Sequence, residues 1–279
     1  MPKKVTERLY QNIFWGFTPK KVLYNKRSKY QKISLYEHPV LGKVLLLDDV
    51  VQFCTQDEHL LHEALVYWPF MVKKQIQNVL IVGGGDLAIA SRLIANKTIK
   101  KIVVVDIDQE VVSVAKRFFP EFSQAVVRDP RVEIVTEDAG AYIKTILKER
   151  FDLVIADTTD EVGVGEVLYS RSFLKDLHTV LSPDGILVKL GGSLFLQKNT
   201  LLRAEKLLKN IFGEGAVGQF GLPLNMYQGG LYIIFACFKN GKFSNKIIPG
   251  KKLPKVRWYS KNVHNAISLI SENLIDKNI

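Results

Sequence analysis

Residues 79–86 read Val-Leu-Ile-Val-Gly-Gly-Gly-Asp, a short apolar run that ends in three glycines and an aspartate. Two further apolar runs also end at an aspartate: 102–105 precedes Asp106, and 153–156 precedes Asp157. Short apolar runs that alternate with helical patterns are typical of parallel strands buried on both faces of a sheet. The carboxyl ends of such strands form the ligand crevice. The sequence therefore predicts several carboxylates in one crevice, which suits a nucleoside carrying amines better than a phosphate-rich ligand.

The alternation of strand and helix continues along the chain and predicts an α/β fold, with a doubly wound Rossmann-like sheet of the methyltransferase type. We expect strands at 79–82, 102–105, 132–136, 152–156, 186–190, 216–220 and 231–238, and helices at 87–96, 109–118, 139–149, 170–181 and 198–211. The last two strands are expected to pair antiparallel. Residues 239–255 resemble a linker, and 256–279 are expected to add a final strand and helix.

The first part of the chain has the alternating pattern of β-structure at 31–36 and 43–47. Asp48-Asp49 suits a hairpin turn because aspartate tolerates left-handed backbone, and helical spacing begins near Glu58. We therefore expect a small N-terminal β-hairpin domain over residues 1–65. A Rossmann-like, nucleoside-binding catalytic domain is expected over residues 66–279.

Composition narrows the class of protein. The net charge is +11, but the lysines are dispersed and no RNA- or DNA-binding motif accompanies them, so we expect solvated faces and no nucleic-acid partner. The alternative is that basic side chains on the surface surround an acidic pocket, which the total charge does not reveal. No apolar run reaches the roughly 18 residues of a membrane span, which predicts a cytoplasmic protein without a membrane partner. Cys54 and Cys237 are expected to be buried reduced thiols, and no His/Cys cluster has metal-ligand spacing.

The aspartates at the strand ends predict the ligand. Asp106 lies 20 residues beyond Asp86, at the end of the next strand, where an acidic side chain typically accepts hydrogen bonds from ribose hydroxyls. Asp138 ends a third strand, the usual place for a carboxylate that reads the adenine amino group. Asp86 would repel a pyrophosphate. Together these residues favour an adenosine ligand.

Asp157 and Asp160 follow the strand at 152–156. Two aspartates at this spacing can simply cap a helix and form a turn. The functional alternative is a carboxylate that binds an ammonium group and accepts a proton while the nitrogen attacks carbon. An amine nucleophile needs such a base because a protonated amine has no lone pair.

These motifs resemble, in order and over nearly the whole chain, those of the spermidine synthase family, the polyamine aminopropyltransferases. The matching stretches are 28–33 (S-x-Y-Q-x-I), 47–52 (L-D-G-x-x-Q), 57–63 (D-E-x-x-Y-H-E), 83–86 (G-G-G-D), 106–108 (E/D-I-D), 137–139 (G-D-G), 157–160 (D-S/T-S/T-D) and the tail at 257–266.

The resemblance implies a role for each candidate residue. Decarboxylated S-adenosylmethionine, or the methylthioadenosine product, would be held by Gln31, His62, Asp106, Asp138 and Ala139. Asp86 would pair with the aminopropyl ammonium, Asp157 would be the base, and Asp160 and Tyr227 would position amines. The nucleoside is a co-substrate, so no metal or cofactor is implied. By analogy the protein would be a homodimer or homotetramer.

The departures from the family pattern concentrate around the amines. Leu87-Ala88 stands in place of Gly-Gly, Leu61 in place of a tyrosine that contacts the acceptor, and Glu161 in place of a proline. The stretch 191–195 lacks the usual Glu and Trp. These changes predict that putrescine is a poor acceptor and that a longer or more highly charged amine is better, against the competing expectation of plain spermidine synthesis. Two alternatives stay open: another S-adenosylmethionine-dependent transferase, such as a methyltransferase, and a non-catalytic nucleoside- or polyamine-binding protein.

Overall fold

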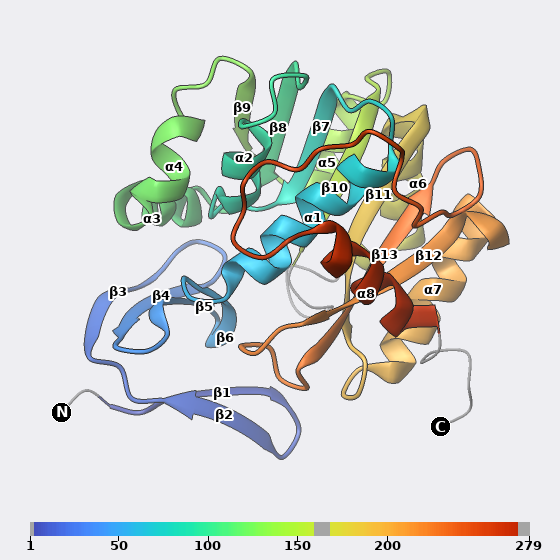
Figure 1. The fold of residues 1–279 in the computed structure, drawn as a ribbon. Coiled ribbons are helices and arrows are strands. Elements are labelled where there is room, and N and C mark those ends of the chain that lie inside the picture. Colours follow the sequence, from blue (N-terminus) through green and yellow to red (C-terminus); the bar gives the residue numbers. More distant parts are fainter. Residues whose placement is uncertain (1–2, 159–167, 273–279) are drawn as a thin grey trace.

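A computed structural model describes residues 3–158 and 168–272. It contains a seven-stranded sheet covered by helices, a four-stranded sheet and a separate hairpin (Figure 1). The strands are β1 (Val5–Tyr10), β2 (Ile13–Phe17), β3 (Lys21–Arg27), β4 (Lys32–His38), β5 (Gly42–Leu47), β6 (Val50–Cys54), β7 (Asn78–Gly83), β8 (Lys101–Asp106), β9 (Val132–Thr136), β10 (Phe151–Asp157), β11 (Leu181–Ser193), β12 (Val217–Pro223) and β13 (Leu231–Phe238). The helices are α1 (Glu58–Val72), α2 (Ala88–Leu93), α3 (Gln109–Phe118), α4 (Pro120–Val126), α5 (Ala139–Thr145), α6 (Arg171–Val180), α7 (Lys198–Phe212) and α8 (Lys261–Glu272).

The large sheet has the strand order β12-β13-β11-β10-β7-β8-β9. Strands β7 to β11 are parallel, and β13 pairs antiparallel with both β11 and β12. The predicted doubly wound fold, including the antiparallel pairing of its last two strands, is confirmed. The chain winds outward from β7 in one direction and from β10 in the other, so the crevice expected at such a switch point lies between these two strands.

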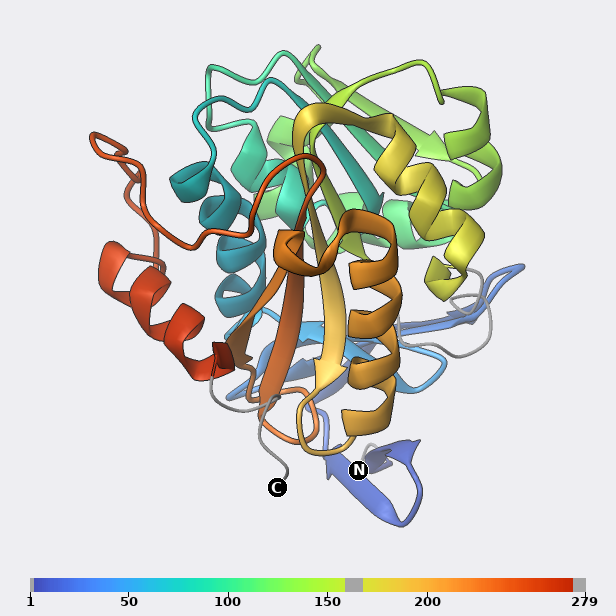
Figure 2. The same cartoon turned by 90° about the vertical axis from the view of Figure 1, so that its right-hand side faces the viewer.

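Both faces of the sheet are buried, which explains the continuous apolar runs. Along β7, Val79 and Ile81 pack on the side of α1 to α4 and α8, whereas Leu80 and Val82 pack on the side of α5 to α7. Figure 2 shows α6 and α7 on one side of the sheet and α1 and α8 on the other. Among the described residues, no helix has both the length and the apolar character needed to cross a membrane.

The N-terminal residues form the expected β-structure. Strands β3 to β6 make an antiparallel sheet, and Asp48 and Asp49 adopt left-handed backbone, with φ of 45° and 64°, in the turn between β5 and β6. Helix α1 then runs through residue 65, where we placed the domain boundary. That boundary stays a prediction.

Two features differ from expectation. Helix α4 was not predicted; Phe119 leaves helical geometry, and Pro120 then begins a new helix, a position that proline favours. The final strand expected within 256–279 is wrong for the described residues, which form only α8 there. Instead, the backbone N–H groups of residues 257, 258 and 259 all donate to the buried carboxylate of Glu63, at 2.9, 2.9 and 2.8 Å. Amides that converge on one side chain cannot form a strand ladder.

A candidate active site at the carboxyl ends of the strands

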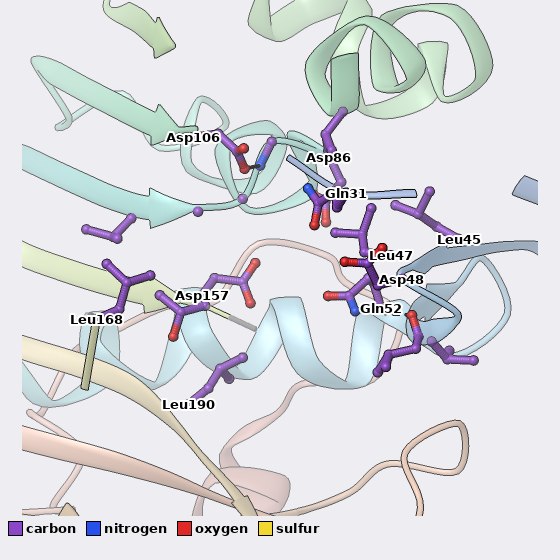
Figure 3. Close-up of a pocket in the computed structure, with 18 of the residues that line it drawn as sticks. Gln31, Leu45, Leu47, Asp48, Gln52, Asp86, Asp106, Asp157, Leu168 and Leu190 are labelled. Atoms are coloured by element: carbon purple, nitrogen blue, oxygen red, sulfur yellow. Dashed lines mark hydrogen bonds between the residues drawn. The ribbon is translucent and has the colours of Figure 1, made fainter. Parts of the chain in front are cut away.

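A cavity of about 320 Å³ lies between the carboxyl ends of β7, β8 and β10 and the N-terminal strands (Figure 3). Its described lining contains no lysine or arginine. It does contain six carboxylates: Glu7, Asp48, Asp86, Asp106, Asp138 and Asp157. A cavity with this charge selects cations. The net charge of +11 does not reveal this, because the lysines and arginines of the described residues lie outside the cavity lining.

Sequence reasoning placed nine residues in the site, and eight of them line this cavity. These eight are Gln31, His62, Asp86, Asp106, Asp138, Ala139, Asp157 and Tyr227. The ninth, Asp160, lies outside the described residues. The structure thus brings the eight together, while the role of each stays a prediction.

The glycine run after β7 allows Asp106 to approach the backbone. One carboxylate oxygen of Asp106 accepts the Gly85 N–H at 3.0 Å, and the other accepts the Asp108 N–H at 2.9 Å. A Cβ atom on Gly85 would lie 2.6 Å from the Asp106 carboxylate, so a side chain at this position would force the carboxylate to move. Burial raises the pKa of Asp106 to about 6, although these two backbone donors oppose the rise. Its orientation suits a hydroxyl-bearing ligand such as a ribose.

Gln31 is oriented by Asp108, a residue that sequence reasoning quoted but gave no role. Asp108 accepts hydrogen bonds from Gln31 Nε2 at 3.0 Å and from Ser28 Oγ at 2.6 Å, and its second oxygen caps α3 through the Glu110 N–H at 3.0 Å. An aspartate directly before a helix is an N-cap signal. That signal predicts the cap but not the link to Gln31.

At the centre of the cavity, His62, Asp86 and Asp157 bring their polar atoms within 4.8 Å of one another. His62 Nδ1 lies 2.7 Å from Glu58 Oε2, and Arg92 holds both oxygens of Glu58 at 2.9 and 2.7 Å. Sequence reasoning did not identify Arg92, and it quoted Glu58 only within the matching stretch 57–63, without a role. The available signal was that Glu58 lies four residues before His62 and so shares its helix face.

This buried cluster shifts the pKa values of its members. Burial raises the pKa of Asp157 to about 7; the charges of Asp86 and Asp106 add to the rise, and that of His62 opposes it. Burial lowers the pKa of His62, but the Glu58 hydrogen bond and the charges of Asp86 and Glu58 outweigh it and raise the pKa overall. A carboxylate that titrates near neutral pH is suited to accepting a proton.

The same three residues are the described group that could hold a metal ion. The contact of His62 Nδ1 with Glu58 is of the kind that orients metal-bound histidines. An ammonium group would meet the same carboxylates, and six acidic side chains in one cavity suit an organic cation at least as well. The geometry alone therefore admits either cation.

The turn between β12 and β13 forms one wall of the cavity and is tied to the N-terminal domain. Tyr227 Oη donates to the Gln52 carbonyl at 2.6 Å, and the Met226 N–H donates to Asp57 at 3.1 Å. Leu61 is one of the residues that depart from the family pattern. It is buried and lines a separate small pocket beside Tyr227. Phe195 is 70% exposed, and Glu161 lies outside the described residues.

Two family models match this chain, one over its N-terminal part and one over most of the remainder. A family model described as the spermine/spermidine synthase domain matches residues 58–247, and one described as the spermidine synthase tetramerisation domain matches residues 6–55. A curated relative from Buchnera aphidicola subsp. Schizaphis graminum, named polyamine aminopropyltransferase, is 32% identical and aligns with 97% of this chain and 96% of its own length. A relative of the same name from Escherichia fergusonii is 30% identical over 98% of this chain and 96% of its own.

Solved structures share the fold. A spermidine synthase in complex with the transition-state analogue AdoDATO superposes with a TM-score of 0.88 at 24% identity, over 96% of this chain and 93% of that one. A spermidine synthase from Thermotoga maritima gives a TM-score of 0.86 at 24% identity, over 96% and 92%.

Proposed function

The chain belongs to the spermine/spermidine synthase family, and we propose that it transfers the aminopropyl group of decarboxylated S-adenosylmethionine to an amine acceptor and releases methylthioadenosine. The main observation in support is that Asp86 and Asp157 lie close together at the carboxyl ends of β7 and β10. The cavity around them is lined by six carboxylates. Both substrates are cations, and this cavity is built for cations. Curated relatives of this chain bear the name polyamine aminopropyltransferase.

The reaction is an in-line displacement. The acceptor nitrogen attacks the aminopropyl carbon bonded to the sulfonium, the C–S bond breaks, and sulfur leaves with the electron pair as the neutral thioether of methylthioadenosine. Asp157 accepts the proton that the nitrogen loses. Asp86 binds the aminopropyl ammonium through a charge-assisted hydrogen bond, which fixes the carbon in front of the nitrogen. Rate acceleration then comes from orientation and from the fixed negative field.

The nucleoside is assigned to the side of β8 and β9. Asp106 at the end of β8 receives the ribose hydroxyls, and Asp138, directly before α5, receives the adenine amino group. His62 and Gln31 complete this half. The arrangement disfavours ordinary S-adenosylmethionine, because its carboxylate would meet Asp86 beside Asp157. This repulsion distinguishes an aminopropyltransferase from a methyltransferase that has the same type of sheet.

The test combines binding and turnover. Calorimetry with decarboxylated S-adenosylmethionine should give tight binding, and ordinary S-adenosylmethionine should bind far more weakly. A product assay over a panel of amines should then yield methylthioadenosine with at least one of them. Binding without any product would support a non-catalytic binding protein instead, and methylated product would support a methyltransferase. Turnover should be unaffected by a metal chelator, since no step requires a metal.

The N-terminal region supports a homo-oligomer, because residues 6–55 match a tetramerisation domain. We assign a homotetramer rather than a dimer. Large apolar side chains on this domain, Phe14 at 68% and Val40 at 72%, are exposed in the single chain and available for contact between copies. Light scattering coupled to size exclusion measures the assembly, and cell fractionation tests the proposed cytoplasmic location.

A further inference from the structure

Gln228 is a cavity residue whose side-chain amide has no hydrogen-bond partner among the described residues. It lines the cavity from the turn between β12 and β13, and both its amide atoms, Nε2 and Oε1, are shielded from solvent without a hydrogen bond. A buried polar group left unpaired costs about 1–3 kcal/mol. Such a cost in a native structure calls for an explanation, and a ligand that completes the hydrogen bonds is one.

The backbone around Gln228 is fixed, so the unpaired amide does not belong to a loose loop. Tyr227, its neighbour, donates from Oη to Gln52, and the Tyr227 carbonyl accepts the Gly230 N–H at 3.1 Å. The Leu231 N–H donates to the Gly229 carbonyl at 2.8 Å. These bonds hold the turn, whereas the side-chain amide of Gln228 makes no hydrogen bond to the described residues.

The sheet order locates Gln228 relative to the reaction centre. Asp157 ends β10, and β13, which begins just after the turn, is two strands away across β11. Two strand spacings amount to about 10 Å. Leu190 of β11 and Tyr232 of β13 line the cavity along this path, and Figure 3 shows Leu190 beyond Asp157 on the side opposite Asp106. Gln228 therefore lies away from the nucleoside half.

We infer that Gln228 is a specificity residue that recognises the nitrogen of the acceptor that does not react. This inference rests on the proposed function. One nitrogen of the acceptor lies at Asp157, the chain passes Leu190 and Tyr232, and the distal ammonium donates a hydrogen bond to the Gln228 amide oxygen. An ammonium has only donors, and the amide oxygen is an acceptor with two lone pairs. The substrate class is thus an amine with a second nitrogen at its far end.

The experiment compares amines that differ only in that nitrogen. The pairs are 1,4-diaminobutane with butylamine and 1,5-diaminopentane with pentylamine, assayed with wild type and with Gln228→Met, a change that keeps an unbranched side chain. For the better diamine, Gln228→Met should lower kcat/KM by roughly ten- to a hundredfold, and for the matched monoamine it should change kcat/KM by less than about twofold. Gln124→Met, on an exposed position of α4, is the matched control and should change neither.

Stability and binding provide readouts that are independent of turnover. Because the substitution removes an unsatisfied buried amide, the melting temperature of free Gln228→Met should stay the same or rise, and the shift caused by methylthioadenosine should be unchanged. An equal loss for diamine and monoamine, or no loss for the diamine, overturns the inference.

Failure of the proposed function has a different signature, namely no transfer by wild type to any amine. Thermal shifts by the amines in the presence of methylthioadenosine then still test Gln228. A larger shift with the diamine than with the monoamine, lost in Gln228→Met, supports the inference. The same difference retained in the variant, or absent in wild type, overturns it.

Discussion

The Nε2 atom of His62 lies 4.0 Å from the Asp86 carboxylate, so a histidine stands beside two acidic groups that would otherwise repel each other. Glu58 supports the charged form of this histidine. Its own pKa is lowered to about 2: burial opposes this, but the hydrogen bond and charge of His62 and the contact with Arg92 outweigh burial. Glu58 is therefore ionised at every pH at which the enzyme works. Through His62, Glu58, which lies outside the cavity lining, therefore influences the ionisation of Asp157.

Glu58→Gln tests this link. Without the Glu58 charge the pKa of His62 falls, and a neutral His62 no longer lowers the pKa of Asp157. Since the base must be ionised, the acid limb of the pH dependence of kcat/KM should move to higher pH. The glutamine retains an acceptor for His62, so methylthioadenosine binding should survive. An unchanged pH profile in a folded variant would show that His62 does not control Asp157.

Asp157→Asn keeps the size of the side chain and removes its ability to accept a proton. Turnover should fall by roughly a hundredfold or more while nucleoside binding persists. In the wild type the rate should rise with pH through about 7, where the buried Asp157 becomes ionised. Single-turnover kinetics with a saturating amine measures both effects. Near-normal turnover in the variant would exclude Asp157 as the base.

Methylthioadenosine should raise the melting temperature of the wild type. A ligand that binds only the folded state stabilises it by about 2.7 kcal/mol at a hundredfold excess over its dissociation constant. Asp106→Ala removes the carboxylate expected to hold the ribose and should abolish most of the shift. The Gln124→Met control should retain it. No shift in the wild type at millimolar ligand would count strongly against the assigned nucleoside half.

Leu87 gives a test of stability at the glycine run. It is fully buried, yet it has left-handed backbone with φ of 67°, where L-residues are disfavoured. Left-handed geometry costs about 1–2 kcal/mol, whereas losing a buried leucine costs about 2–5 kcal/mol. Leu87→Gly should therefore destabilise the protein, but less than Leu87→Ala, which loses the side chain and keeps the strain. Denaturant unfolding of the two variants compares them directly, and the reverse order would contradict the argument.

Elements of the fold that depend on the local sequence could be predicted, whereas those that depend on contacts between distant residues could not. The strands β7, β8 and β10 were predictable because each is an apolar run that ends at a polar residue. The segment at 257–259 was not, because its conformation depends on the carboxylate of Glu63, which lies almost two hundred residues earlier in the chain. Local patterns carry no information about such a contact.

The same distinction applies to the site. Asp86, Asp106 and Asp157 follow strands, so topology alone gathers them in one crevice. Gln228, Glu58 and Arg92 have no such signal. Gln228 lies in the turn between β12 and β13, and its neighbour Tyr227 bonds to Gln52, a contact between residues far apart in the chain. Arg92 matters only because α2 packs against α1 and aligns it with Glu58.

The last prediction concerns which amine is the preferred acceptor. It is based on the positions at which this chain departs from the family pattern. Leu61 stands where the family has a tyrosine, and a lost hydrogen-bonding group costs about 1–3 kcal/mol, roughly ten- to a hundredfold in specificity. The cavity nevertheless keeps Glu7 and Asp48 in addition to the four aspartates assigned to the nucleoside and the reacting amines. Loss of a neutral contact with retention of negative charge favours an acceptor with more positive charge. We therefore expect putrescine to be a poor acceptor and a longer or more highly charged amine to be better. Specificity constants for putrescine, cadaverine, agmatine and spermidine decide the matter, and a clear preference for putrescine would establish plain spermidine synthesis instead.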